Sequence, residues 1–280
     1  MEATSASLAR RWWNSRLGYR FFVEVVCMVG AFFVYKLVRF VMRGEASEAI
    51  DNAHTVVDIE RALRFFTEPD LQQLVVDHPL LVKFLNQYYI GAHFPVTIAV
   101  LVWLYIRRPL GYRTTRRILL VASGVGMLIH IAYPLAPPRM LPSLGFVDTG
   151  ELWGPAAYGP GAVFGDIANE FAAMPSLHFG WAVIMAVALV RYGRSPLRWL
   201  IVLHPMLTTA AIVMTANHYW LDALVAGFVI ALLYAISSLG SRMLPRRSPA
   251  PPEPPAEPVR AVIDVRDDEV GALRTTASSS

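Results

Sequence analysis

The chain has 280 residues, of which 55% are hydrophobic and only 16% are charged, and its mean hydropathy is +0.43. These values exclude an ordinary soluble domain and predict an integral membrane protein in a lipid bilayer. The formal net charge of +4 does not indicate a nucleic-acid partner, because the basic residues lie between the apolar runs, as expected for a membrane protein. The single cysteine, Cys27, excludes a disulfide within the chain.

Apolar runs predict an all-α fold, a bundle of six membrane-spanning helices. The predicted spans are 21–41, 79–106, 118–134, 178–190, 199–215 and 219–239. We expect a basic cytoplasmic N-terminus (1–20), a catalytic membrane domain (21–243) and a disordered, proline-rich cytoplasmic tail (244–280). The fourth run is short for a full crossing, so that helix is expected to extend at one end.

Residues 48–66 have a different pattern from the six runs. Apolar residues recur there at three- and four-residue spacing and charged residues fall on the opposite side, which predicts an N-terminal amphipathic helix at the membrane surface. The sequence Thr67-Glu68-Pro69-Asp70 then predicts a new helix start. Both a hydrophobic gate for a lipid and a simple connector are compatible with this segment.

Two polar clusters stand where loops meet apolar runs, and each contains a histidine. They are Met174-Pro175-Ser176-Leu177-His178 and Asn217-His218-Tyr219-Trp220-Leu221-Asp222. His218 and Asp222 are four residues apart, so a helix would place them on one face. The carboxylate could then hold the Nδ1 hydrogen of the imidazole and raise the basicity of its other nitrogen. With His178 as a second imidazole, the clusters predict an oriented nucleophile or base and a separate acid.

In their order and membrane context, these clusters resemble the motifs of the type 2 phosphatidic acid phosphatase (PAP2) superfamily. Tyr133-Pro134-x-x-Pro137-Pro138-Arg139 is similar to the first motif of its inositolphosphotransferase branch, which includes inositol phosphorylceramide synthases. The resemblance covers roughly residues 50–240. It implies a membrane lipid phosphotransferase or phosphatase in which His218 is the nucleophile and forms a phosphohistidine.

The resemblance also implies roles for the remaining candidates. His178 would protonate the leaving oxygen and later activate the acceptor, while Asp222 orients the nucleophile. Arg139 is the candidate phosphate clamp, because a guanidinium group matches phosphate with two hydrogen bonds; an interfacial anchor is the alternative. Ser176 would either contact phosphate or only cap the helix that follows. The sequence has no carboxylate or thiolate cluster that predicts a metal site, and no cofactor is expected.

The chain departs from the wider superfamily at two positions. The first motif there has lysine, six residues, then Arg-Pro; Arg108-Pro109 matches its end, but Leu101 stands at the lysine position. The expected topology also places Arg108 in the cytoplasm, so we exclude this pair. The third-motif arginine, six residues before the histidine, is Ile212. Phosphate binding is therefore expected to depend on Arg139 and backbone amides.

Basic residues concentrate in segments that six alternating helices would place on one side. These segments are the N-terminus, 107–117, 191–198 and the region after 242. The positive-inside rule then predicts a multi-pass cell-membrane protein with both termini in the cytoplasm and the active site on the extracytoplasmic side.

Several activities remain open at this stage. Both transfer of a phospho-headgroup to a lipid or polyol and hydrolysis of a phospholipid or polyprenyl phosphate fit the motifs. A haem protein or a lipid-binding protein without catalysis is the non-enzymatic alternative. The sequence also leaves a homo-oligomer open. The polar residues of the second span, Asn86, Tyr88 and His93, are expected to hydrogen-bond between helices in preference to a headgroup.

Overall fold

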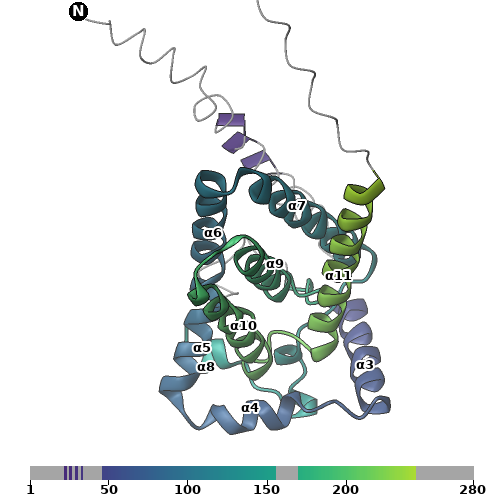
Figure 1. Ribbon diagram of the computed structural model, residues 1–280. Helices are drawn as coiled ribbons and strands as arrows, with labels where there is room; N and C mark the ends of the chain where they lie inside the picture. The colour runs from purple at the N-terminus through teal and green to yellow at the C-terminus, as the bar shows by residue number, and fades with distance from the viewer. Residues whose placement is uncertain are drawn as a thin grey trace, which may run out of the picture. The chain divides into compact units, whose positions relative to one another are not determined.

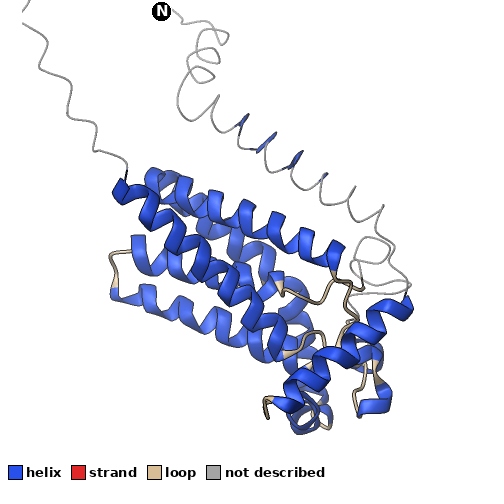
Figure 2. Cartoon of the chain, turned by 90° about the vertical axis from the view of Figure 1, so that its right-hand side faces the viewer, coloured by secondary structure: helices blue, strands red, loops and turns tan. Residues whose placement is uncertain are grey.

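The computed structural model describes residues 46–155 and 170–243, together with residues 22, 23, 25, 26, 29, 30 and 33 in helical conformation. The predicted N-terminus, most of the first span and the predicted tail lie outside the described residues. Apart from the last two residues of the final helix, the described residues belong to one compact unit, 1–241. Every described element is helical, which confirms the all-α class (Figure 2).

The described helices follow one another along the chain with short 3₁₀ helices between them. They are α3 (Ala46–Ala62), α4 (Glu68–Val76), α5 (Pro79–Gly91), α6 (His93–Arg107), α7 (Pro109–Ala132), η1 (Pro138–Met140), η2 (Pro142–Leu144), α8 (Thr149–Trp153), α9 (Leu177–Tyr192), η4 (Pro196–Val202), α10 (Leu203–Met214) and α11 (Trp220–Met243). Helix α9 lies between α6, α7, α10 and α11 (Figure 1). Its buried face includes Gly180, Ala182, Ala186 and Ala188, and such small residues let neighbouring helices approach closely.

The candidate membrane spans are fewer than the six predicted. Three helical stretches are long and apolar enough to cross a bilayer: Pro109–Ala132, Pro196–Met214 and Trp220–Leu239. Helices α5 and α6, which meet at 45°, would supply a fourth if they form one bent span. Helix α9 is apolar, but its 16 residues extend only about 24 Å at 1.5 Å per residue. The described residues therefore support a multi-pass membrane protein with three to four candidate spans.

Two predicted helix boundaries were wrong, and proline explains both. The predicted helix 79–106 is broken at Ala92, because Pro95 has no N–H for the carbonyl group of Gly91. The predicted loop 107–117 is largely helix, because Pro109 starts α7 at a position where the missing N–H costs nothing. By contrast, the short fourth run extends to 177–192, as expected.

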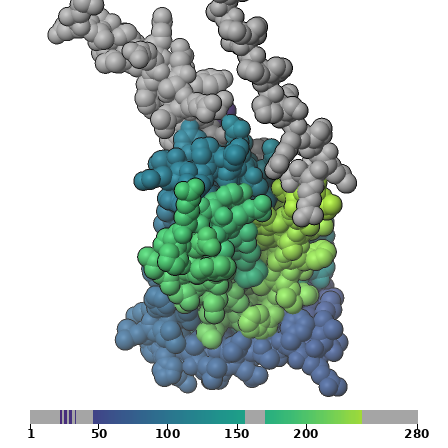
Figure 3. Space-filling model, in the orientation of Figure 1, coloured from purple at the N-terminus to yellow at the C-terminus, as the bar shows by residue number. Residues whose placement is uncertain are grey.

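Helices α3 and α4 lie at one end of the bundle, where the blue residues of α3–α5 form a band in Figure 3. The predicted amphipathic pattern of α3 is only partly buried: Ala53 and Val56 pack against the protein, whereas Ile59 and Leu63 are exposed. The buried part joins a cluster formed with the loop after α7 and with Tyr219. The second helix start is confirmed, since α4 begins at Glu68.

Candidate active site

The turn between α10 and α11 carries His218 next to Asp222. The turn is closed by the backbone N–H groups of Asn217 and His218, which donate to the carbonyl oxygen of Ile212 at 2.9 and 3.0 Å. Nδ1 of His218 lies 3.1 Å from Oδ2 of Asp222 and 2.9 Å from the carbonyl oxygen of Ala173. Both partners are acceptors, so Nδ1 carries the hydrogen. Nε2 is left with its lone pair, as a nucleophile or base requires.

The second cluster meets the first at the N-terminus of α9. His178 is half-buried, and its ring centroid lies 6.2 Å from that of His218. Oγ of Ser176 accepts the N–H of Phe179 at 3.4 Å, so this residue caps α9. The N–H of Ser176 donates to the carbonyl oxygen of Asp222 at 3.2 Å, which joins the start of α9 to the first turn of α11.

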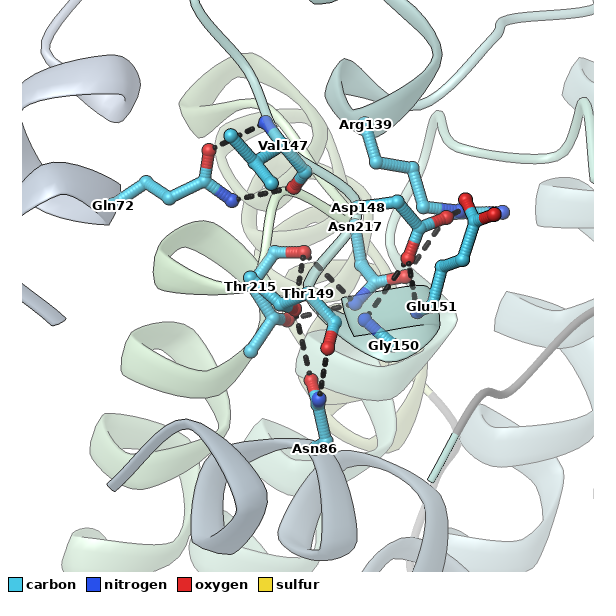
Figure 4. Close-up of polar contacts among 10 residues, drawn as sticks. All are labelled: Gln72, Asn86, Arg139, Val147, Asp148, Thr149, Gly150, Glu151, Thr215 and Asn217. Atoms are coloured by element: carbon cyan, nitrogen blue, oxygen red, sulfur yellow. Dashed lines mark hydrogen bonds and ion pairs between the residues drawn. The ribbon is translucent and has the colours of Figure 1, made fainter. Parts of the chain in front are cut away.

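Arg139 lies in η1 and reaches the same turn. Its backbone N–H donates to the carbonyl oxygen of Ala216 at 2.9 Å, and its Nη1 donates to Oδ1 of Asn217 at 2.9 Å. Its Nε is 3.4 Å from Oδ2 of Asp148, a carboxylate of the same loop (Figure 4). The predicted phosphate clamp is therefore hydrogen-bonded to the residue that directly precedes His218.

Side chains of α4 and α5 fix the loop that carries Arg139 (Figure 4). Gln72 makes a reciprocal pair of 2.9 Å hydrogen bonds with the main chain of Val147. Asp148 caps α8 by accepting two backbone N–H groups. Asn86 bonds to the hydroxyl and carbonyl groups of Thr149. These side-chain anchors were not predicted from the sequence. Residues 156–169 of this loop lie outside the described ranges.

Aromatic rings from α5 and α6 border His178. The ring centroids of Tyr89 and His93 lie 4.3 and 4.7 Å from that of His178. His93 also stacks on Trp181, with centroids 4.6 Å apart. The expected hydrogen bond between helices is found for Tyr88, which contacts His204 Nδ1 at 2.6 Å, whereas the contacts of His93 are ring contacts. Tyr89 and Trp181 were missed as neighbours of the site; their helical spacing from the two histidines was the available signal.

Neither departure from the superfamily pattern places a cation near His218. The side chain of Ile212 is fully buried in an apolar cluster, and only its carbonyl group serves the turn. Arg108 donates to the carbonyl oxygen of Tyr192 at 3.0 Å. Tyr192 lies 14 residues (192 − 178) after His178 on α9, which is about 21 Å along the helix axis. Arg108 thus lies at the end of α9 remote from His178, which agrees with the exclusion of Arg108-Pro109 as a phosphate-binding motif.

The family model of the PAP2 superfamily matches residues 54–237. The chain belongs to the PAP2 superfamily. No curated protein and no solved structure matches it. Members of the PAP2 superfamily are generally phosphatases or phosphotransferases, and the matched region contains all five candidate residues: Arg139, Ser176, His178, His218 and Asp222.

Within the ranges that the structure describes, this PAP2 protein has no group of three or more His, Cys, Asp or Glu side chains arranged to hold a metal ion. The groups gathered at the site are two imidazoles, one buried carboxylate and one guanidinium. Such a set can supply a nucleophile, a proton donor and a phosphate ligand.

Proposed function

We propose that this PAP2 protein is a membrane lipid phosphotransferase that forms a phosphohistidine at His218. The observation that carries the proposal is the double acceptor contact of His218 Nδ1, with Oδ2 of Asp222 and the carbonyl oxygen of Ala173. The hydrogen is held on Nδ1, so the lone pair of Nε2 is available to attack phosphorus. Asp222 also stabilises the positive charge that the ring gains as the P–N bond forms.

The reaction runs in two steps that share the same groups. In the first, Nε2 of His218 bonds to phosphorus, the P–O bond to the leaving group breaks, and His178 gives its proton to the leaving oxygen. In the second, His178 takes the proton of the acceptor hydroxyl, the acceptor oxygen bonds to phosphorus, and the P–N bond breaks. Arg139 and the first amides of α9, with Ser176, would hold the phosphoryl oxygens throughout.

The choice of acceptor separates transfer from hydrolysis. The Tyr133–Arg139 motif favours an inositolphosphotransferase-like protein, which passes a phospho-headgroup from a phospholipid to a lipid or polyol. The alternative is a phosphatase for lipid or polyprenyl phosphates, in which water attacks the same phosphohistidine. Because His218 and His178 serve both reactions, only the product distinguishes them.

The test uses the purified protein with phosphate-labelled phosphatidylinositol and phosphatidic acid in mixed micelles. We expect an acid-labile adduct in the wild type and none in His218→Ala. With ceramide or glycerol present, label should move to the acceptor; label found only in free phosphate or free inositol phosphate would favour the phosphatase. An adduct that persists in His218→Ala would refute the nucleophile.

We also propose that six spans place both termini in the cytoplasm and the site on the extracytoplasmic side. The contact of Arg108 with Tyr192 supports this orientation, because it joins the two basic segments 107–117 and 191–198 at the end of α9 remote from His178.

Single exposed cysteines in a Cys27→Ser background test the orientation. Ser143, in η2, and Ser195, beyond the end of α9, are both exposed. An impermeant maleimide applied to intact cells should label Ser143→Cys but not Ser195→Cys until the membrane is opened. The reverse pattern would place the site in the cytoplasm.

A further inference from the structure

Three carboxylates from three parts of the chain accept the backbone N–H groups at the start of α11. The contacts are Tyr219 N–H to Asp222 Oδ2 at 2.9 Å, Trp220 N–H to Glu68 Oε1 at 3.0 Å, and Leu221 N–H to Glu60 Oε1 at 2.7 Å. The first amides of a helix have no acceptor within the helix, and their partial positive charge favours carboxylates. Glu60 comes from α3 and Glu68 from α4, the two helices at this end of the bundle (Figure 1).

The two glutamates are fully buried but have different hydrogen-bond partners. Glu68 accepts an N–H group at each oxygen, from Trp220 at Oε1 and from Thr67 at Oε2. Both of its oxygens therefore have a donor. Glu60 accepts only the N–H of Leu221, and no N–H or hydroxyl group of the described residues donates to its Oε2. A buried oxygen without a donor is costly unless it carries a proton of its own.

Oε2 of Glu60 has no hydrogen-bond partner among the described residues, which favours a neutral carboxyl group over a buried charge. Burial, reinforced by the neighbouring carboxyl group of Glu68, raises the pKa of Glu60 to about 9, so that Glu60 is neutral near pH 7. The titratable groups that act on Glu60 are Glu68 from α4 and Asp222 from α11. Arg61, its neighbour on α3, is exposed and pairs with Asp58. Glu60 is thus a neutral acceptor for the N–H of Leu221 near pH 7.

We propose that Glu60 and Glu68 are positioning residues that hold the first turn of α11 so that Asp222 faces His218. Neither glutamate contacts a reacting atom; both act through the backbone N–H groups of Trp220 and Leu221. The proposal rests on the proposed function of His218. It assigns to α3 and α4 the task of orienting the catalytic helix.

The two glutamates differ in a way that a matched pair of substitutions can test. In Glu60→Gln, the amide oxygen still accepts from Leu221, and the NH₂ group takes the place of the oxygen to which no N–H group of the described residues donates. In Glu68→Gln, the NH₂ group must face a backbone N–H, from Trp220 or Thr67, because both oxygens of Glu68 accept. One buried N–H donor then loses its acceptor, which should lower kcat about tenfold.

The experiment measures turnover of phosphatidic acid and phosphatidylinositol in mixed micelles for both variants and for Glu60→Ala. We expect Glu68→Gln and Glu60→Ala to lose about tenfold or more in kcat with little change in KM. Glu60→Gln should recover most of the activity that Glu60→Ala loses. Equal activities of Glu60→Gln and Glu68→Gln would overturn the proposal.

A second readout does not depend on turnover. In protein labelled with ¹⁵N-histidine, the Nδ1–H resonance that disappears in His218→Gln reports the contact with Asp222. Glu68→Gln should shift this resonance and Glu60→Gln should leave it in place; a resonance unmoved in both overturns the proposal. The wild type could show the resonance, and Glu68→Gln could shift it, while the wild type turns over neither lipid. In that case the proposed function fails and the positioning role remains supported.

The wild-type protein keeps the proposal testable if Glu68→Gln does not fold. Raising the pH through about 9 ionises Glu60 and adds a negative charge beside the carboxyl groups of Glu68 and Asp222. The His218 resonance and kcat should then change reversibly in the wild type, whereas Glu60→Gln, which cannot ionise, should show neither change. The same alkaline response in both proteins would overturn the proposal.

Discussion

Asp222→Asn is the most informative single change at the candidate active site. It removes the charge that faces His218 while preserving the size of the side chain and an oxygen that can accept a hydrogen bond. In the Ser-His-Asp triad of serine proteases, where an aspartate also holds Nδ1 of a histidine, the amide allows the imidazole to adopt the wrong tautomer, with a loss of about 10⁴ in kcat. Here the carbonyl oxygen of Ala173 lies 2.9 Å from the same Nδ1 and holds the hydrogen independently of Asp222.

The expected loss is therefore that of one charge-assisted hydrogen bond and not that of the tautomer. Such a bond contributes about 1.5–3 kcal/mol, which corresponds to about 10- to 150-fold in the rate of phosphohistidine formation. Asp222→Ala should lose more, because the N–H of Tyr219 then also lacks its acceptor.

Single-turnover formation of the acid-labile adduct from phosphate-labelled phosphatidic acid measures this rate. Asp58→Asn is the matched control, since the same change at an exposed side chain of α3 should have no effect. A loss of about 10⁴ or more in Asp222→Asn would show that Ala173 does not hold the tautomer. An unchanged rate would remove Asp222 from the mechanism.

Four further predictions concern His178, Arg139, the C-terminal tail and Glu60. His178→Ala should slow both formation and breakdown of the adduct, seen by rapid quench, whereas His218→Ala should form none. Arg139→Lys should raise KM for the labelled lipids, because an ammonium group cannot contact Asn217 and phosphate in the same planar arrangement. An unchanged KM would favour the alternative role of Arg139 as an interfacial anchor. Truncation after Ser248 should leave activity in detergent within a small factor. Because the folded state holds the proton of Glu60 from its ordinary pKa of 4.5 up to about 9, the free energy of unfolding should fall as pH rises through this window, and Glu60→Gln should flatten the fall in thermal unfolding curves.

The parts of the site that depend on local spacing were predictable from the sequence. His218 and Asp222 are four residues apart, and a helix start after His218 is enough to bring them together. The cap at Ser176 follows in the same way from a short polar residue before an apolar run. The meeting of His178 with His218 depends instead on contacts between segments forty residues apart, such as that of Ser176 with Asp222, and only the family resemblance indicated it.

The glutamate pair was missed although α3 contains a signal for it. Ala49, Ala53, Val56 and Val57 form a buried stripe at helical spacing, and Glu60 occupies the next position of that stripe. A glutamate at a buried position indicates a partner elsewhere, but the sequence does not reveal that this partner is the start of α11. The breaks at Pro95 and Pro109 were also within reach, because proline at these positions ends one helix or starts another.

The two helix N-termini that meet at the site are capped by different groups, and this difference gives the two helices different roles. At the start of α11, three backbone N–H groups already donate to the carboxyl groups of Glu60, Glu68 and Asp222, so these N–H groups cannot bind a phosphate group. The start of α9 is capped by the neutral hydroxyl group of Ser176, and its positive end has no such carboxylate in its cap. A phosphoryl group between the two helices would therefore orient its oxygens toward α9 and present phosphorus to the histidine held by α11. If both helices had the same kind of cap, the same sequence motifs would not favour one orientation of the phosphoryl group over the other.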